Sequence, residues 1–206
     1  MKIKNYKIEN YKGGYTIIET MVAISLFLVV IMYGMTSLLN ANLVHRKSQD
    51  LRSIIDNLSF IMEDMSKNIR TGYNVQCYRK GTDTTISSGT IGAPRSCSDG
   101  WALAFEATNG DPGSNADQWV YYIDTSTSIG KIFRSTTGLT TSAVQLTPDE
   151  IDIDSISGFS VLGAPAPLGD QQQPFVIIRL VGTITYKNTI TKFSLQTSVS
   201  QRLVDI

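Results

Sequence analysis

Residues 20–44 contain no charged side chain, and this stretch constrains the fold of the chain more than any other feature. Most positions from 15 to 39 are Ile, Leu, Val, Met, Phe or Ala. As an α-helix the uncharged stretch would be about 37 Å long at roughly 1.5 Å per residue, and the hydrocarbon core of a bilayer is about 30 Å thick. The sequence therefore predicts a helix that crosses a membrane.

The flanking charges predict the orientation of this helix. Four lysines and one acid precede it, namely Lys2, Lys4, Lys7, Lys12 and Glu9. Positive residues tend to stay on the cytoplasmic side, so we expect the N-terminus inside and the rest of the chain outside, although Arg46 and Lys47 oppose this weakly. The apolar run is longer than that of a secretory signal and lacks its small-residue cleavage site, so we expect the helix to be retained.

The helical pattern continues beyond the uncharged stretch. Apolar residues recur at spacings that trace one face of an α-helix, at Leu51, Ile54, Ile55, Leu58, Ile61, Met62, Met65 and Ile69. Gly72 follows this face, and Lys67 and Arg70 lie in its last turn, which is typical of a helix end. We predict one helix over about 16–71, with its first half covered by lipid or similar helices and its second half packed on a sheet.

After Gly72 the sequence is typical of an antiparallel sheet, with Thr, Ser, Val, Ile and aromatic residues between closely spaced turn residues. We expect strands at 101–107, 118–124, 131–135, 156–162, 175–186 and 189–202, and loops at 81–100, 109–117 and 163–174. The last two strands form the clearest hairpin, joined at Lys187 and Asn188. The predicted class is α+β, a long N-terminal helix and a C-terminal antiparallel sheet, with 46–206 as a globular extracytoplasmic domain.

Cys77 and Cys97 both follow the predicted membrane helix, on the side where oxidation is permitted. We therefore favour a disulfide between them. Closing a loop of about 20 residues would stabilise the fold by about 3 kcal/mol. Two buried free thiols are the alternative.

Residues 14–19, with the sequence GYTIIE, stand between a lysine-rich segment and the uncharged helix. This arrangement resembles the class III prepilin signal of the type IV pilin-like family. The resemblance implies that a membrane-embedded prepilin peptidase cuts between Gly14 and Tyr15 and methylates the new amine of Tyr15. Residues 1–14 would then be a leader and 15–45 the transmembrane and filament-core helix. The family usually has Phe at the first mature position, and Tyr is an aromatic variant.

Glu19 would be the lone charge at the head of a lipid-facing helix, where an ionised carboxylate is costly unless it is paired. The resemblance implies that Glu19 neutralises the α-ammonium group of a neighbouring subunit during assembly. The alternative is that this acid only complements the dipole of its own helix.

A narrower resemblance concerns the C-terminal end, where residues 193–202 look like the last strand of minor pilins and of J-type or W-type minor pseudopilins. This match implies a minor subunit that helps to initiate or cap a type IV pilus or a type II secretion pseudopilus. The order of a long helix, a disulfide-capable loop and an antiparallel sheet also resembles the pilin fold. The implied partners are the prepilin peptidase, other pilins, the membrane assembly platform and, before assembly, membrane lipid. The implied location is the cytoplasmic membrane, crossed once, and then a cell-surface or periplasmic filament.

We expect no enzymatic activity and no cofactor. His45 is the single histidine, which rules out multi-histidine metal sites and His-based triads within the chain, and neither a phosphate-binding glycine loop nor a G-x-S-x-G elbow occurs. Two alternatives stay open: an anchored binding module that is not polymerised, and a DNA-uptake pilus subunit. The balance of 18 basic and 18 acidic residues gives the second no support.

Three further groups of residues are candidates for binding sites. Calcium ligands are conceivable at Asp111, Asn115 and Asp117, and at Asp149, Glu150, Asp152 and Asp154, but neither group has EF-hand spacing, so we expect no metal. A binding surface is conceivable at Trp101, Phe105, Trp119, Tyr121 and Tyr122. Alternating aromatics are more often core, and we expect that here.

Overall fold

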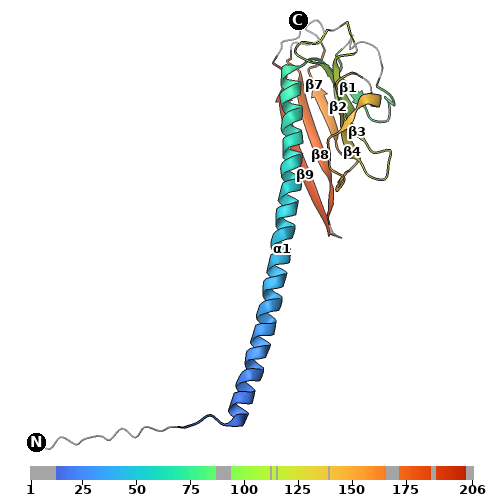
Figure 1. Ribbon diagram of the computed structural model, residues 1–206. Coiled ribbons are helices and arrows are strands. Elements are labelled where there is room, and N and C mark those ends of the chain that lie inside the picture. The colour runs from blue at the N-terminus through green and yellow to red at the C-terminus, as the bar shows by residue number, and fades with distance from the viewer. Residues whose placement is uncertain are drawn as a thin grey trace, which may run out of the picture. The chain divides into compact units, whose positions relative to one another are not determined.

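The computed structural model describes residues 13–86, 94–111, 113–114, 116–138, 140–165, 172–186 and 189–202. Most of the predicted leader, residues 1–12, lies outside the described residues. The chain divides into two compact units, Met1–Gln49 and Asp50–Ile206. One helix, α1 (Ile17–Thr71, 55 residues), belongs to both, and all the strands belong to the second unit (Figure 1).

Helix α1 ends where the sequence predicts. The amide of Gly72 donates hydrogen bonds to the carbonyls of Asn68 (3.0 Å) and Ile69 (3.3 Å), which closes the last turn. A Cβ atom at position 72 would overlap the ring of Phe105 and lie 2.8 Å from the carbonyl oxygen of Glu106. Glycine is therefore required here because the chain passes against β2 as it leaves the helix.

Among the described residues, nine strands form one antiparallel sheet. Their bounds are β1 Tyr73–Arg79, β2 Cys97–Glu106, β3 Gln118–Asp124, β4 Lys131–Ser135, β5 Val144–Gln145, β6 Ile151–Ile153, β7 Gly158–Leu162, β8 Phe175–Tyr186 and β9 Thr189–Ser200, with a 3₁₀ turn at Thr140–Ser142. The order is β5-β4-β3-β2-β7-β8-β6, with β1 paired to β2 and β9 paired to β8. A long helix followed by an antiparallel sheet confirms the α+β class.

Strand β2 changes partner along its length. Ala102 pairs with Tyr78 of β1 and with Tyr122 of β3, whereas Gly100 pairs with β1 on one side and with Phe159 of β7 on the other. Strands β3 and β7 therefore follow one another along the same edge of β2. The sheet has a junction at this point.

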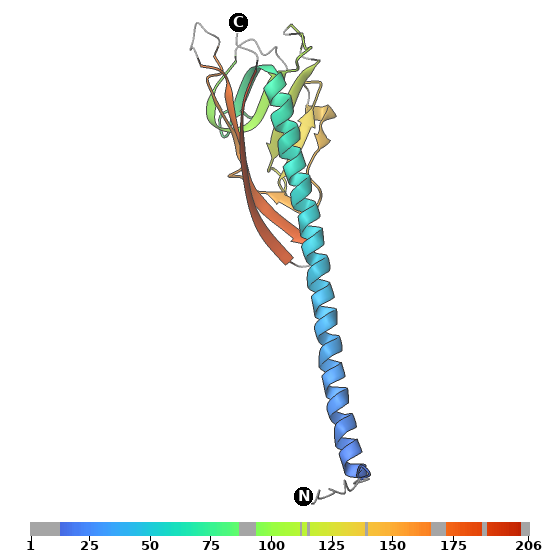
Figure 2. The ribbon, with the colours of Figure 1, turned by 90° about the vertical axis from the view of Figure 1, so that its left-hand side faces the viewer.

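The core of the second unit lies between α1 and one face of the sheet, as Figures 1 and 2 show. The buried residues of the helix are Ile54, Leu58, Ile61, Met62, Met65 and Ile69, and they pack with buried residues of most of the strands. Leu51 packs partly against this cluster. The prediction was wrong for Ile55, which is 39% exposed, because it lies at the border of the stripe that faces the sheet.

The β8–β9 hairpin is confirmed, with pairing from Phe175–Ser200 to Tyr186–Thr189. Its joining residues, 187–188, lie outside the described residues, as do 166–171 of the predicted loop at 163–174. The predicted strands at 118–124 and 131–135 have the bounds of β3 and β4, and the predicted loop at 109–117 contains no strand in its described part.

Other predictions of strands and loops were wrong. Strands β1, β5 and β6 were not expected, and β2 begins at Cys97, inside the predicted loop at 81–100. Arg95 in that loop also forms a bridge with Gln76 of β1. The reason is that these segments become strands only by pairing with distant residues: most of the partners of β1 lie at 102–106 of β2, and the start of β2 pairs with β7 through Cys97–Val161 and Gly100–Phe159.

Candidate functional site

The peptide bond predicted to be cleaved lies before α1, in the non-helical segment 13–16. Gly14 is exposed, and the side chain of Tyr15 is 82% exposed. A Cβ atom built at Gly14 meets no atom within 4 Å. This bond is therefore open to another protein, and the fold itself does not require glycine at position 14.

Thr16 caps the helix. Its Oγ1 accepts a hydrogen bond from the backbone amide of Glu19 (3.2 Å), and its carbonyl accepts one from the amide of Thr20 (3.2 Å). Threonine at the N-cap and glutamate three residues later is the residue order of a capping box. The sequence analysis gave Thr16 no role, although the T-x-x-E spacing was the signal that would have found it. The cap fixes the helix start and leaves Tyr15 outside the helix.

Glu19 lies exposed in the first turn of α1 and is the single charged side chain between residues 13 and 44. None of the ion pairs among the described residues includes it. A carboxylate at this position stabilises the N-terminal end of the helix dipole. The same carboxylate is also free to meet a positive group from outside the chain.

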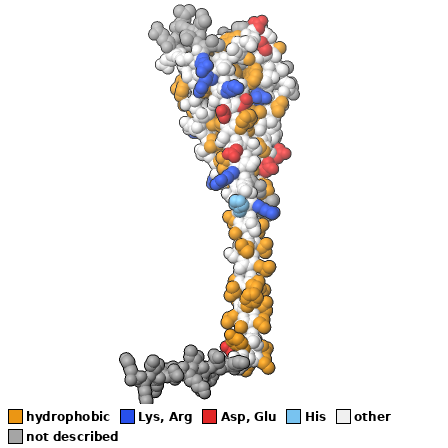
Figure 3. Space-filling model, turned by 60° about the vertical axis from the view of Figure 1, so that its left-hand side comes forward, with side chains coloured by type: hydrophobic (Ala, Val, Ile, Leu, Met, Phe, Trp, Pro, Cys, Tyr) orange, Lys and Arg blue, Asp and Glu red, His pale blue; other side chains and the backbone are white. Residues whose placement is uncertain are grey.

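The helix surface of the first unit is apolar and uncovered. Every residue from 13 to 49 is exposed, and the most apolar 18-residue window has a mean hydropathy of 2.3 with none of it buried. Figure 3 shows hydrophobic side chains over the visible face of this helix. One helix is thus long and apolar enough to cross a membrane.

Three hydroxyl groups in this segment have partners within the helix. The hydroxyl groups donate hydrogen bonds of 2.8 Å to backbone carbonyls one turn earlier: Thr20 to Ile17, Ser25 to Val22 and Thr36 to Met32. In lipid an unpaired hydroxyl is costly, and these bonds remove that cost. The segment is therefore suited to lipid or to the apolar surfaces of other helices.

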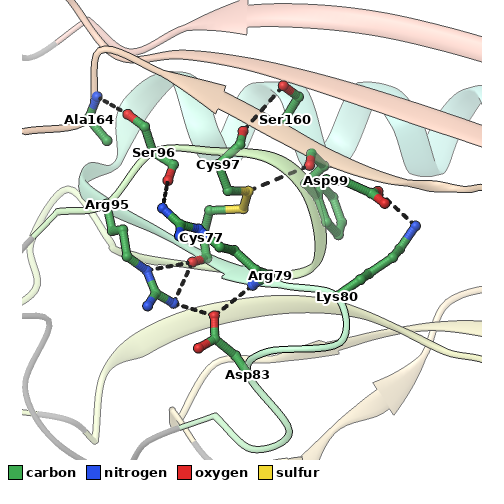
Figure 4. The surroundings of a disulfide bond; sticks show 11 residues. Cys77, Arg79, Lys80, Asp83, Arg95, Ser96, Cys97, Asp99, Ser160 and Ala164 are labelled. Carbon is green, nitrogen blue, oxygen red and sulfur yellow. Dashed lines mark hydrogen bonds and ion pairs between the residues drawn. A yellow bond between two sulfur atoms is a disulfide. The ribbon is translucent and has the colours of Figure 1, made fainter.

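Cys77 of β1 and Cys97 of β2 form a disulfide, with their Cα atoms 5.8 Å apart and both residues buried (Figure 4). The Arg95 guanidinium donates to the carbonyl of Cys77 through Nε (3.0 Å) and Nη2 (2.8 Å), and it pairs with Asp83 (2.6 Å). Asp83 also accepts the amide of Arg79 (2.7 Å). These contacts fix both ends of the loop that the disulfide closes.

Gly100 is the close neighbour of this disulfide. A Cβ atom at position 100 would overlap the sulfur of Cys77 and lie 3.0 Å from the sulfur of Cys97. It would also lie 3.0 Å from the carbonyl oxygen of Tyr78. The sulfurs therefore occupy the space that a side chain at position 100 would need.

The five candidate aromatic residues fall on opposite faces of the sheet. Phe105 and Tyr121 are buried in the core under α1, which confirms the core prediction for both, and half-buried Trp119 packs partly against that core. Burial raises the pKa of Tyr121 to about 12. Trp101 and Tyr122 are likewise half-buried and pack against a smaller buried cluster on the other face, so the core prediction is met only in part for them and for Trp119. Burial, with a smaller contribution from a nearby carboxylate, also raises the pKa of Tyr122.

The first acidic group, Asp111, Asn115 and Asp117, is held by a hydrogen bond within it, because Asp117 accepts one from the backbone amide of Asp111 (2.8 Å). Asn115 lies outside the described residues.

Sequence analysis missed Glu106, which is fully buried and accepts a hydrogen bond from Gln118 (2.9 Å). Its other oxygen has no hydrogen-bond partner among the described residues. Burial, followed by the negative charges of Asp117 and Asp111, raises the pKa of Glu106.

The second acidic group stabilises turns. Asp152 accepts a hydrogen bond from the backbone amide of Gly130 (2.7 Å), and Asp154 accepts one from the backbone amide of Ile156 (3.2 Å).

The single histidine, His45, is exposed on α1, and its ring lies 3.2 Å from the side-chain amide of Gln49. Within the described part of the chain, no group of three or more His, Cys, Asp or Glu residues is arranged to hold a metal ion.

No family model matches the chain. Neither a curated protein nor a solved structure matches it significantly. Its function is therefore inferred from its own residues.

Proposed function

We propose that this chain is a type IV pilin-like subunit, a minor pilin or pseudopilin that helps to initiate or cap a type IV pilus or a type II secretion pseudopilus. One observation carries the proposal. The exposed Gly14–Tyr15 bond lies immediately before a capped helix whose exposed, apolar first half contains a single charge, Glu19. The proposed fold is accordingly the pilin fold.

The cleavage step is supported by what surrounds Gly14. Hydrolysis of the bond would release residues 1–14 with a terminal carboxylate and leave an amine on Tyr15. In its neutral form this amine would take a methyl group from a sulfonium methyl donor at the same peptidase, which would release the demethylated donor, and the product would then be protonated. A Cβ atom at Gly14 would meet no atom of the described residues within 4 Å. The glycine is thus best explained by the peptidase, whose active site must accommodate the chain as it approaches the scissile bond.

The assembly step is supported by the uncovered apolar surface of residues 15–45. In the cytoplasmic membrane, with the N-terminus inside, lipid would cover this surface, and in the filament other pilins would replace the lipid. The Glu19 carboxylate of one subunit would pair with the Tyr15 amine of its neighbour. Burial of an ion pair in an apolar bundle is tolerated only when both charges are matched, so this pairing would also fix the register between subunits.

The second unit would lie outside the cytoplasmic membrane, where a disulfide is stable. Its role would be to contact other minor subunits and the membrane assembly platform. The proposal involves no catalytic activity, cofactor or nucleic acid.

The test is mass spectrometry of the intact protein and its N-terminal peptide after expression of the full chain in its native host. Wild type should begin at N-methyl-Tyr15, and Gly14→Val should stay uncut. The matched control is Gly13→Val, since position 13 is equally free of contacts and should still be cut after Gly14. A wild-type chain that begins at Met1, or is cut elsewhere, would overturn the proposal in favour of an anchored binding module.

A further inference from the structure

Beyond the apolar helix, the second unit has a cleft at the junction where β2 changes partner. Strand β3 ends at Asp124 and β7 begins at Gly158, and both lie along the same edge of β2. The two strands leave a space beside Trp101, between the Gly100–Phe159 pair and the Ala102–Tyr122 pair. The cleft has a volume of about 860 Å³, within the usual range of small-ligand sites.

A β-bulge turns Trp101 toward this cleft. The β1–β2 register steps from Tyr78–Ala102 to Arg79–Gly100, so Trp101 is an extra residue without a partner in β1. Strand alternation would place Trp101 on the core face, whereas its side chain packs with Ala102 on the opposite face. Bulges commonly re-aim a side chain in this way next to functional sites.

The rings of Trp101 and Tyr122 line the cleft as part of a row across the sheet. Tyr78 and Trp101 have their ring centroids 6.3 Å apart, as do Trp101 and Tyr122. Tyr122 stacks on Phe133 of β4 at 5.1 Å. The Trp101 indole N–H donates to the carbonyl of Asp83 (2.7 Å), which fixes the ring while leaving it half-buried. The rings are thus held rigidly and partly uncovered.

The charge of the cleft decides which ligand it suits. Lys80 is the single cationic side chain among the described lining residues. Its ammonium group pairs with Asp99 (2.9 Å) and donates hydrogen bonds to the carbonyls of Ser155 (2.8 Å) and Ser157 (2.6 Å). Two carboxylates, Asp83 and Asp124, also line it. An anionic ligand such as nucleic acid or a phosphate ester would meet no free positive charge there.

We propose that this cleft binds a neutral oligosaccharide. Aromatic faces carry partial negative charge and attract the C–H faces of sugar rings, which stack on them. The remaining lining is rich in hydroxyl and carboxylate groups, which bond sugar hydroxyls as acceptors or donors. Trp101 and Tyr122 supply the stacking surface, and the proposal does not depend on cleavage at Gly14 or on polymerisation.

The experiment is a titration of the purified full chain, held in a detergent without a sugar head group, followed by tryptophan fluorescence and saturation-transfer NMR. The neutral probes are cellotetraose, chitotetraose and maltotetraose. The contrasting probes are tetragalacturonate, which is anionic, and decaproline, which also docks on aromatic grooves. We expect at least one neutral probe to bind, and neither contrasting probe.

Variants locate the binding. Trp101→Ala and Tyr122→Ala should each weaken it about tenfold or more, whereas Tyr122→Phe, which keeps the ring, should change it about threefold or less. Thr125→Trp places a bulky ring at an exposed position of the cleft and should block binding without altering the core. The control is Phe60→Ala, which removes a 70% exposed ring that does not line the cleft.

Three results would overturn the proposal. One is that no neutral probe binds at about 10 mM, a concentration that would reveal even weak affinity. Another is that binding survives unchanged in Trp101→Ala, Tyr122→Ala and Thr125→Trp. Binding of decaproline or tetragalacturonate in place of the neutral probes would also overturn it and would assign the cleft to a different ligand.

Discussion

The hydroxyl group of Tyr121 on β3 donates a hydrogen bond of 3.3 Å to Asp64 Oδ2 on α1. The same hydroxyl accepts a bond from Asn68 (2.9 Å), and Arg134 on β4 donates to the same Asp64 oxygen (3.1 Å). One phenol therefore connects helix and sheet at the edge of the core. Burial of this group raises its pKa to about 12, so at neutral pH it keeps the proton that it donates.

Tyr121→Phe removes this connection and keeps the ring. We expect the free energy of unfolding to fall by about 1–2 kcal/mol, because Asn68 and Asp64 each lose a partner in a partly buried position. Denaturant unfolding of the full chain, followed by near-UV circular dichroism, measures the change. Tyr122→Phe is the matched control, since its hydroxyl forms no hydrogen bond among the described residues. Equal losses in the two variants would contradict the expectation.

Glu106 makes stability depend on pH. Its pKa in the folded state is raised from 4.5, first by burial, so the folded chain holds this proton more tightly than the unfolded chain. The resulting stabilisation is full below about pH 4.5 and is lost as the pH rises through the folded-state pKa. Glu106→Gln is uncharged at every pH and does not lose this stabilisation. The difference between its unfolding midpoint and that of wild type should therefore change in favour of the variant as the pH is raised from 4.5 to neutrality.

The control for this measurement is Glu63→Gln, at an exposed glutamate on α1. Its midpoint should run parallel to that of wild type over the same pH range. A constant offset between Glu106→Gln and wild type would show that the carboxyl group of Glu106 does not titrate differently on folding.

Gly100→Ala tests the packing of the disulfide. The added Cβ would overlap the Cys77 sulfur, so we expect a loss of about 2–4 kcal/mol in unfolding free energy. Part of the protein should also carry free thiols, which alkylation and mass spectrometry detect. Gly34→Ala, where the new atom meets nothing within 4 Å, should stay fully oxidised. A fully oxidised Gly100→Ala with wild-type stability would refute the prediction.

Glu19→Gln separates the two roles of this residue. The Thr16 cap bonds the backbone amide of residue 19, so the helix start and the cleavage of the leader should be retained. Loss of the charge should lower the share of processed protein in the sheared filament fraction about tenfold or more, because the partner amine would be buried unpaired. Quantitative mass spectrometry measures this share, with Glu63→Gln as control. Unchanged incorporation would leave Glu19 with only its effect on the helix dipole.

The sequence alone determined the features that depend on near neighbours in the chain. The uncharged run and the 3.6-residue period defined α1, and Gly72 marked its end within one residue. The β8–β9 hairpin followed from the alternation of two adjacent strands. Residues 14–19 carried the proposed processing signal, because that signal consists of consecutive residues.

Only the tertiary structure decided the features that depend on distant residues. Strand β1 was not predicted because it directly follows the end of the helix and Asn74 has a φ of 53°, which is not a strand conformation, and it becomes a strand through pairing with β2. The bulge at Trp101 and the full burial of Glu106 likewise depend on the register between strands. Local periodicity reports which side of an element is apolar. It does not report which strand lies alongside, and that pairing determined the cleft, the disulfide environment and the buried carboxyl group.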